Sequence, residues 1–221
     1  MKHNVSFLHT SPAAIPPLMR YYGEHAPEME ITNLLDDGIL RRFASGDPAF
    51  VEDRFEDMLR TARGVYRAEA AMITCSAVSG PMLDRLRRSS ACPILKVDGP
   101  MARQAAQVGS RIGVALTFLP SLEPTRRLLL DAAAEAGRAI EIVTETMPDA
   151  YTALLGGNPE CHDSLLLEGL HRLAAQDVNA IVLAQVSMAR ALQQARRAVP
   201  VPVLSSLDTS LAAIREILDA Q

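Results

Sequence analysis

Cys75 is the residue whose type and position most favour chemistry in this sequence. It ends an apolar run that begins at Ala70 and predicts a strand, and it stands where the pattern predicts the next helix to begin. A thiol at a helix N-terminus has a lowered pKa and is exposed to a ligand. A cysteine outside a disulfide is also commonly an inert core residue, so the spacing alone leaves both interpretations open.

Small hydroxyl residues follow several of the predicted strands, at the ends where parallel α/β sheets bind ligands. Each turn leads into a predicted helix, and the N–H groups at a helix N-terminus attract anions. Taken one at a time, these residues are more simply explained as helix caps. As a set they predict a site for a small carboxylate, with phosphate as an alternative. The candidate binding residues are His9, Thr10, Ser11, Ser76, Ala77, Thr117, Gln185, Val186 and Ser187.

The other two cysteines give weaker evidence of a chemical role. Cys92 precedes a proline at the start of a predicted strand, on the opposite edge from the candidate turns, and is interpreted as filler. Cys161 and His162 are adjacent, so on a helix they point in different directions. Metal-ligand spacing, a phosphate-binding loop, a glycine-rich dinucleotide loop and a nucleophile elbow are all missing from the sequence. We therefore expect neither a metal nor a cofactor.

The composition narrows the function classes. The 221 residues carry a formal net charge of -4, which gives no electrostatic case for binding nucleic acid. Arginine pairs such as Arg41-Arg42 and Arg196-Arg197 are predicted to lie on solvated helix faces. No apolar run approaches the length of a membrane span, and the N-terminal run is too short and interrupted for a signal peptide. Three widely spaced cysteines form no disulfide framework, which favours a reducing cytoplasm.

Short apolar runs alternate with longer amphipathic stretches, a pattern typical of parallel sheets covered by helices. The predicted strands are Val5–His9, Glu30–Leu35, Ala70–Cys75, Ile94–Val97, Ile112–Thr117, Ile140–Thr144, Ala180–Gln185 and Val201–Leu204. The predicted helices are Asp47–Tyr66, Glu123–Gly137, Pro159–Ala175, Ser187–Val199 and Thr209–Ala220.

The number of strands does not by itself separate two α/β lobes from a (β/α)8 barrel, although 221 residues is short for a barrel. Two similar halves favour the lobes, because each has a strand that ends in a polar turn, Thr74–Ala77 or Ala184–Ser187. We predict an α/β protein with two pseudo-symmetric lobes, each a mainly parallel four-stranded sheet flanked by helices. The first lobe would comprise residues 1–98 and 206–221, and the second residues 99–205.

The turns Thr74–Ser76 and Leu183–Met188 resemble the paired catalytic turns of the aspartate/glutamate racemase superfamily, especially its hydantoin racemase branch and short relatives. Arg111–Thr117 is similar to the opening strand of that family's second lobe, and Val97–Ala102 to its lobe connection. The resemblance extends over nearly the whole chain. It implies an active site in the cleft between the lobes, no cofactor and a small carboxylate-bearing substrate, and it is compatible with a homodimer.

In this superfamily two cysteines, one per lobe, flank the α-carbon of the substrate, and one removes the proton that the other replaces. The resemblance assigns the first cysteine to Cys75. The second position is Gln185, whose amide is neither an acid nor a base. Ser76 stands where glutamate racemases often have Asn, Ser187 replaces a His, and His9 lies near the missing acid of the first strand. These departures argue against a two-cysteine amino-acid racemase.

The main hypothesis is an isomerase-like enzyme in which Cys75 transfers a proton at the carbon next to a carboxylate, by isomerisation, tautomerisation or decarboxylation. Racemisation stays open if His9 or water supplies the second proton. The hydroxyls and backbone N–H groups would hold the carboxylate and stabilise an enediolate, and Gln185 would hydrogen-bond the substrate. Alternatives are a single-cysteine decarboxylase similar to the arylmalonate enzymes, a covalent nucleophile, and a carboxylate-binding protein without chemistry.

Overall fold

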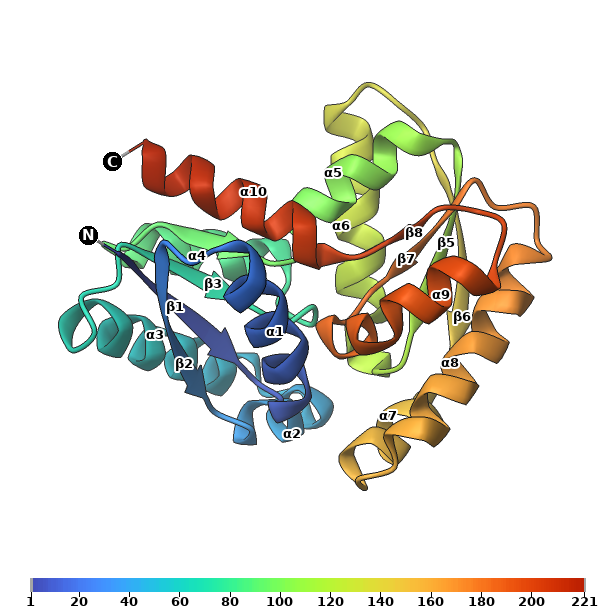
Figure 1. Ribbon diagram of the computed structural model, residues 1–221. Helices are drawn as coiled ribbons and strands as arrows, with labels where there is room; N and C mark the ends of the chain where they lie inside the picture. Colours follow the sequence, from blue (N-terminus) through green and yellow to red (C-terminus); the bar gives the residue numbers. More distant parts are fainter. Residues whose placement is uncertain (1, 221) are drawn as a thin grey trace. The chain divides into compact units, whose positions relative to one another are not determined.

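The computed structural model describes residues 2–220, which form two compact units. Unit 1 comprises the chain up to Val97 together with the segment from Leu207 onward, and unit 2 comprises Asp98–Ser206. The last helix, α10 (Ser206–Asp219), therefore belongs almost entirely to unit 1 (Figure 1). A hydrogen bond of 3.0 Å between the hydroxyls of Tyr22 and Ser210 ties it to the first helix of that unit.

Unit 1 is built on a parallel four-stranded sheet with the order β2-β1-β3-β4. Its strands are β1 (His3–His9), β2 (Met29–Leu35), β3 (Ala70–Ile73) and β4 (Ile94–Lys96). Besides α10, its helices are the 3-10 helix η1 (Pro12–Ala14), α1 (Ile15–His25), α2 (Gly38–Ser45), α3 (Pro48–Gly64) and α4 (Gly80–Ser89).

Unit 2 repeats this plan with a parallel sheet of order β6-β5-β7-β8. Its strands are β5 (Arg111–Leu116), β6 (Glu141–Thr146), β7 (Ala180–Leu183) and β8 (Val203–Leu204). Its helices are α5 (Gly99–Val108), η2 (Leu119–Ser121), α6 (Leu122–Glu135), α7 (Pro148–Leu155), α8 (Pro159–Ala174), η3 (Val186–Ala191) and α9 (Leu192–Ala198). Two separate parallel sheets confirm the predicted two-lobed α/β fold and exclude the barrel.

The central strand β5 explains why the sheet of unit 2 is covered on both faces. Ile112, Val114 and Leu116 pack in a buried apolar cluster that includes residues of α5 and α6, whereas Ala115 belongs to a second cluster with residues of α8 and α9. Alternate residues of a strand point to opposite faces, so one strand contributes to both clusters. Each buried large apolar side chain stabilises the fold by about 1.5–3 kcal/mol, which fixes the strands and leaves their ends to polar residues.

Several helices have no predicted range, although a helix was expected after the turns at Ser11 and Cys75. They are α1, α2, α4, α5 and α7, and they span only 8 to 11 residues each. Most of them carry proline in the first turn, where the missing N–H would have had no partner within the helix. The predicted helix Ser187–Val199 also differs, because its first part is the 3-10 helix η3 and α9 begins only at Leu192.

The two sheets can be compared residue by residue through their register. The last residue of β3 and the last residue of β7 each pair with the penultimate residue of the neighbouring strand, β1 or β5. The next backbone N–H donates to that same partner, at 3.0 Å in both units. Cys75 and Gln185 each come second after their strand, so they occupy equivalent positions in the two units.

Candidate functional site

Cys75 lies in a buried turn at the carboxyl end of β3, with 6% of the residue exposed. The helix that follows, α4, begins only at Gly80, where Ser79 caps it by accepting a hydrogen bond from Met82 N at 3.4 Å. The prediction that Cys75 opens a helix is therefore wrong. Ser79 and the proline after Gly80 form the stronger helix start, and they leave Cys75 in the preceding turn.

His9 is a fully buried residue at the end of β1 whose two ring nitrogens are both bonded. Nδ1 lies 2.9 Å from Thr74 Oγ1, and Nε2 lies 2.8 Å from Asn33 Oδ1. An amide oxygen only accepts, so Nε2 carries the proton, and the single hydroxyl hydrogen of Thr74 has two acceptors within reach, His9 Nδ1 and Leu8 O at 3.1 Å. Burial lowers the pKa of His9 from 6.5 to about 4, against an opposing contribution from Asn33. His9 is thus neutral near neutral pH and holds the residue that precedes Cys75.

This depressed pKa predicts a loss of stability in acid. The unfolded chain takes up a proton at His9 near pH 6.5, whereas the folded protein takes it up only near pH 4. The contribution of neutral His9 to the unfolding free energy is therefore complete above pH 6.5 and falls as the pH drops from 6.5 to 4. We expect His9 to remove up to about 3 kcal/mol of the unfolding free energy between about pH 7 and pH 4. Urea unfolding at both pH values would measure it.

The matched variants for this prediction are His9→Gln and His25→Gln, because His25 is exposed. The His9 variant should lack the acid-dependent part of the loss, and the His25 variant should keep it. Equal losses in the wild type and in His9→Gln would contradict the assignment.

The hydroxyls predicted for unit 1 lie at this same end of the sheet. Thr10, Ser76 and Ala77 are buried, in the turns that follow β1 and β3. Ser11 is half-buried and its hydroxyl accepts a hydrogen bond from Ala13 N at 3.3 Å, which makes it the cap of η1. For Ser11 the helix-cap interpretation therefore holds. Thr10, Ser76 and Ala77, in contrast, lie in or next to the Cys75 turn.

Lys96 contacts the Cys75 turn, and it was not among the residues predicted from the sequence. It ends β4, it is only 3% exposed, and its ammonium Nζ donates to the backbone oxygen of Ser76 at 3.4 Å. A lysine at the end of a short strand resembles an ordinary surface residue in the sequence, so no local signal identified it.

Gln185 joins the two corresponding turns of unit 2 through its amide. Its Oε1 accepts from Thr117 N at 2.7 Å and from Thr117 Oγ1 at 3.1 Å, while Nε2 donates to Ser121 Oγ at 2.7 Å. Val186 and Ser187 follow as the first residues of η3, and both are buried. Within the described residues these bonds use both lone pairs of Oε1, so one N–H of the amide is left for a ligand.

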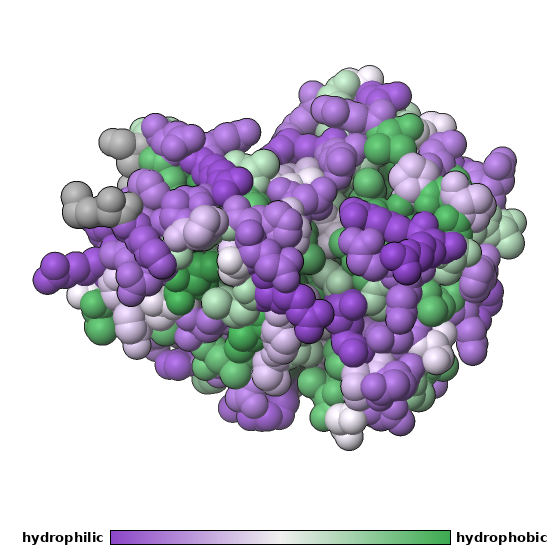
Figure 2. All heavy atoms as spheres, viewed as in Figure 1, coloured by the Kyte–Doolittle hydropathy of each residue, from purple (hydrophilic) through white to green (hydrophobic). Residues whose placement is uncertain are grey.

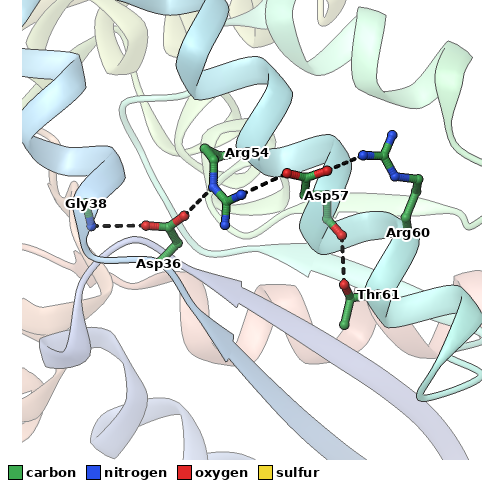
Figure 3. Close-up of polar contacts among 6 residues, drawn as sticks. All are labelled: Asp36, Gly38, Arg54, Asp57, Arg60 and Thr61. Atoms are coloured by element: carbon green, nitrogen blue, oxygen red, sulfur yellow. Dashed lines mark hydrogen bonds and ion pairs between the residues drawn. The ribbon is translucent and has the colours of Figure 1, made fainter.

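A pocket of about 300 Å³ lies at the carboxyl end of β2 in unit 1. Figure 3 shows its ion pairs: Arg54 contacts Asp36 at 2.7 Å and Asp57 at 2.8 Å, and Arg60 also pairs with Asp57. Asp36 Oδ1 in addition accepts from Gly38 N at 3.1 Å, at the start of α2. Each charge here is paired with an opposite one. We therefore interpret these ion pairs as contacts that hold α2 and α3 at the end of β2.

The remaining cysteines lie away from these turns. Cys92 is buried just before β4, at the opposite end of the sheet from Cys75, and burial raises the pKa of its thiol. This confirms its prediction as a filler. Cys161 is exposed while His162 is fully buried, which confirms that the adjacent pair points in different directions. Among residues 2–220, no group of three His, Cys, Asp or Glu residues is placed to hold a metal ion.

The surface agrees with the predicted distribution of charge. Figure 2 shows hydrophilic residues over much of the visible face of both units, with hydrophobic residues between them. The pairs Arg41-Arg42 and Arg196-Arg197 are exposed, as predicted. None of the helices in the described part of the chain is both long enough and apolar enough to cross a membrane.

Comparison with known proteins finds similarity at the level of family and fold. The family model described as Asp/Glu/Hydantoin racemase matches residues 41–214. Glutamate racemase from Bacillus anthracis is 16% identical, with a TM-score of 0.76 over 99% of this chain and 82% of that one. Allantoin racemase from Klebsiella pneumoniae is 18% identical, with a TM-score of 0.74 over 99% and 89%. Aspartate racemase from Picrophilus torridus is 11% identical, with a TM-score of 0.74 over 97% and 94%. The curated protein sequences contain no match.

Proposed function

Because the chain belongs to the Asp/Glu/hydantoin racemase family and is a racemase-type enzyme, we propose that Cys75 transfers a proton at the carbon next to the carboxylate of a small acid. The observation that carries this proposal is the pair of equivalent turns in the two units. One holds a thiol, Cys75, and the other holds an amide, Gln185, at the matching position. The proposed reaction needs no cofactor, because a thiolate and a thiol suffice to remove and return a proton.

A single acid–base group limits the reactions that this site performs. Gln185 has no proton to exchange near neutral pH, and its amide is engaged with Thr117 and Ser121. His9 is a poor second base, because its pKa is lowered to about 4 and both its nitrogens are bonded. Cys75 would therefore deliver the proton on the face from which it came, either to the same carbon, which gives only exchange with solvent, or to another atom of the substrate, which gives isomerisation or tautomerisation. Inversion at the carbon would need water as the second proton donor.

Decarboxylation is a second candidate, and the single thiol favours it. Loss of carbon dioxide from a malonate leaves the electron pair of the broken carbon–carbon bond on the α-carbon. The thiol of Cys75 then donates its proton to that carbanion, so one acid is enough and no base is required.

Binding of the substrate carboxylate is assigned to the polar groups that border the turn in unit 1. Thr10 and Ser76 supply hydroxyls, and the turn around Ser76 and Ala77 supplies backbone N–H groups, whereas the N–H of Val78 already donates to Cys75 O at 3.4 Å. Such donors stabilise an enediolate when they are already oriented before charge develops, because little reorganisation is then needed.

The test is proton exchange at the α-carbon. The protein is mixed in deuterated water with a panel of α-substituted carboxylic acids and 2-substituted malonates, and each acid is followed by NMR. Loss of the α-proton signal in a monoacid indicates proton transfer. If the configuration at the α-carbon is also inverted, water completes the reaction. Release of carbon dioxide from a malonate indicates decarboxylation. Saturable binding of an acid without exchange or decarboxylation would refute the proposal.

A further inference from the structure

Lys96 is an unusual residue in this chain by type and by burial. The chain has 22 basic residues, but Lys2 and Lys96 are its only lysines. Lys2 is exposed, whereas Lys96 is 3% exposed at the end of β4. Removing an ammonium from water is costly, and an apolar side chain would fill the same place at lower cost. A buried lysine at a strand end therefore indicates a use for its charge.

The backbone register places this charge at the Cys75 turn. Lys96 pairs with Ile73, the last residue of β3, and the following backbone N–H of Val97 donates to Ile73 O at 3.0 Å. From there the side chain reaches past the end of β3, where Nζ donates to Ser76 O at 3.4 Å. Ser76 is the residue directly after Cys75, so the ammonium lies beside the turn that carries the thiol.

On the proposed role of Cys75, we propose that Lys96 is a positioning residue whose ammonium stabilises the Cys75 thiolate. The thiolate is the form that accepts a proton from a carbon acid, and a nearby positive charge increases its population. The turn needs such a charge because α4 begins only at Gly80, which removes the helix N-terminus from Cys75. Lys96 thus provides the stabilisation of the thiolate that the sequence pattern attributed to a helix N-terminus.

Among residues 2–220, the other titratable groups on the strand and helices next to the turn do not supply a positive charge. His9 on β1 is neutral, and Tyr22 on α1 is kept neutral because burial raises its pKa. Asp98, two residues beyond Lys96, is an acid. On α4, Arg85 pairs with Glu52 on α3 and Arg87 donates to the backbone oxygen of Ile94, at the other end of β4.

The test is a titration of the Cys75 thiol in the intact protein without substrate. The far-ultraviolet absorbance of the thiolate is followed against pH, and the curve of a Cys75→Ser variant is subtracted. The wild-type midpoint should lie below the ordinary value of about 8.5. In Lys96→Met the midpoint should rise by about one unit or more, which means at least a tenfold smaller thiolate fraction near neutral pH.

Two further variants separate charge from structure. Lys96→Arg retains the positive charge and should keep the midpoint low, and Lys2→Met removes a charge elsewhere and should leave it unchanged. Equal midpoints in the wild type and Lys96→Met would overturn the inference. So would a wild-type midpoint at or above the ordinary value, which decides the matter even if Lys96→Met does not fold. Either result leaves the proton-transfer proposal to the exchange experiment, which is measured independently.

Discussion

Replacing Cys75 with alanine is expected to lower the rate of α-proton exchange by a factor on the order of 10²–10⁴, the usual contribution of a positioned acid or base. The reason is chemical, because alanine removes the group that takes the proton. The binding of the acid should remain nearly unchanged, since the carboxylate is assigned to hydroxyls and backbone N–H groups that alanine does not touch. NMR in deuterated water measures the exchange, and a ligand titration of the variant measures the binding.

The matched control for Cys75→Ala is Cys161→Ala, because Cys161 is an exposed cysteine on α8 in unit 2. It removes a thiol from the same chain without touching the Cys75 turn, and its exchange rate should equal that of the wild type. Cys75→Ser gives a second comparison, since a hydroxyl fills nearly the same space but ionises far less readily than a thiol. Exchange at the wild-type rate in Cys75→Ala would contradict the proposed role of this residue.

Gln185→Ala is expected to destabilise the protein by about 3–4 kcal/mol, a large part of a typical unfolding free energy of 5–15 kcal/mol. The variant deletes the acceptor for the N–H and hydroxyl of Thr117 and the donor to Ser121, and it leaves the buried Thr117 N–H without this partner. A buried donor that loses its partner costs about 1–3 kcal/mol, and the remaining bonds add to this loss. Thermal unfolding should show the midpoint falling by roughly 10 °C.

The control for this prediction is Gln193→Ala on α9, where the glutamine is exposed and its loss should change the midpoint little. Gln185→Glu should fall between alanine and the wild type, because it keeps the acceptor for Thr117 but replaces the N–H that donates to Ser121. An unchanged unfolding midpoint in Gln185→Ala would show that the amide network contributes little to stability, and it would favour a role of Gln185 in binding the substrate.

The elements of the fold were largely predictable from the sequence, because each one depends on neighbouring residues. Apolar runs such as Ala70–Ile73 and Ala180–Leu183 are buried on both faces, and a continuous run of this kind is what a central parallel strand requires. The start of α3 was equally visible, because Asp47 caps it and Pro48 opens it. The ranges of the short helices with proline in their first turn were not predicted, since 8 to 11 residues carry little periodicity.

Position along the chain also singled out Cys75 and Gln185, since each follows an apolar strand at the end where parallel sheets bind ligands. The sequence by itself thus determined the two-unit α/β plan, the equivalent turns and the asymmetry between a thiol and an amide. What surrounds those two residues was decided by the tertiary structure alone. His9 and Thr74 are 65 positions apart, Thr117 and Gln185 are 68 apart, and Lys96 is 20 residues from the carbonyl it contacts. Parallel pairing brings such residues together by register, and no local pattern records which side chains then meet.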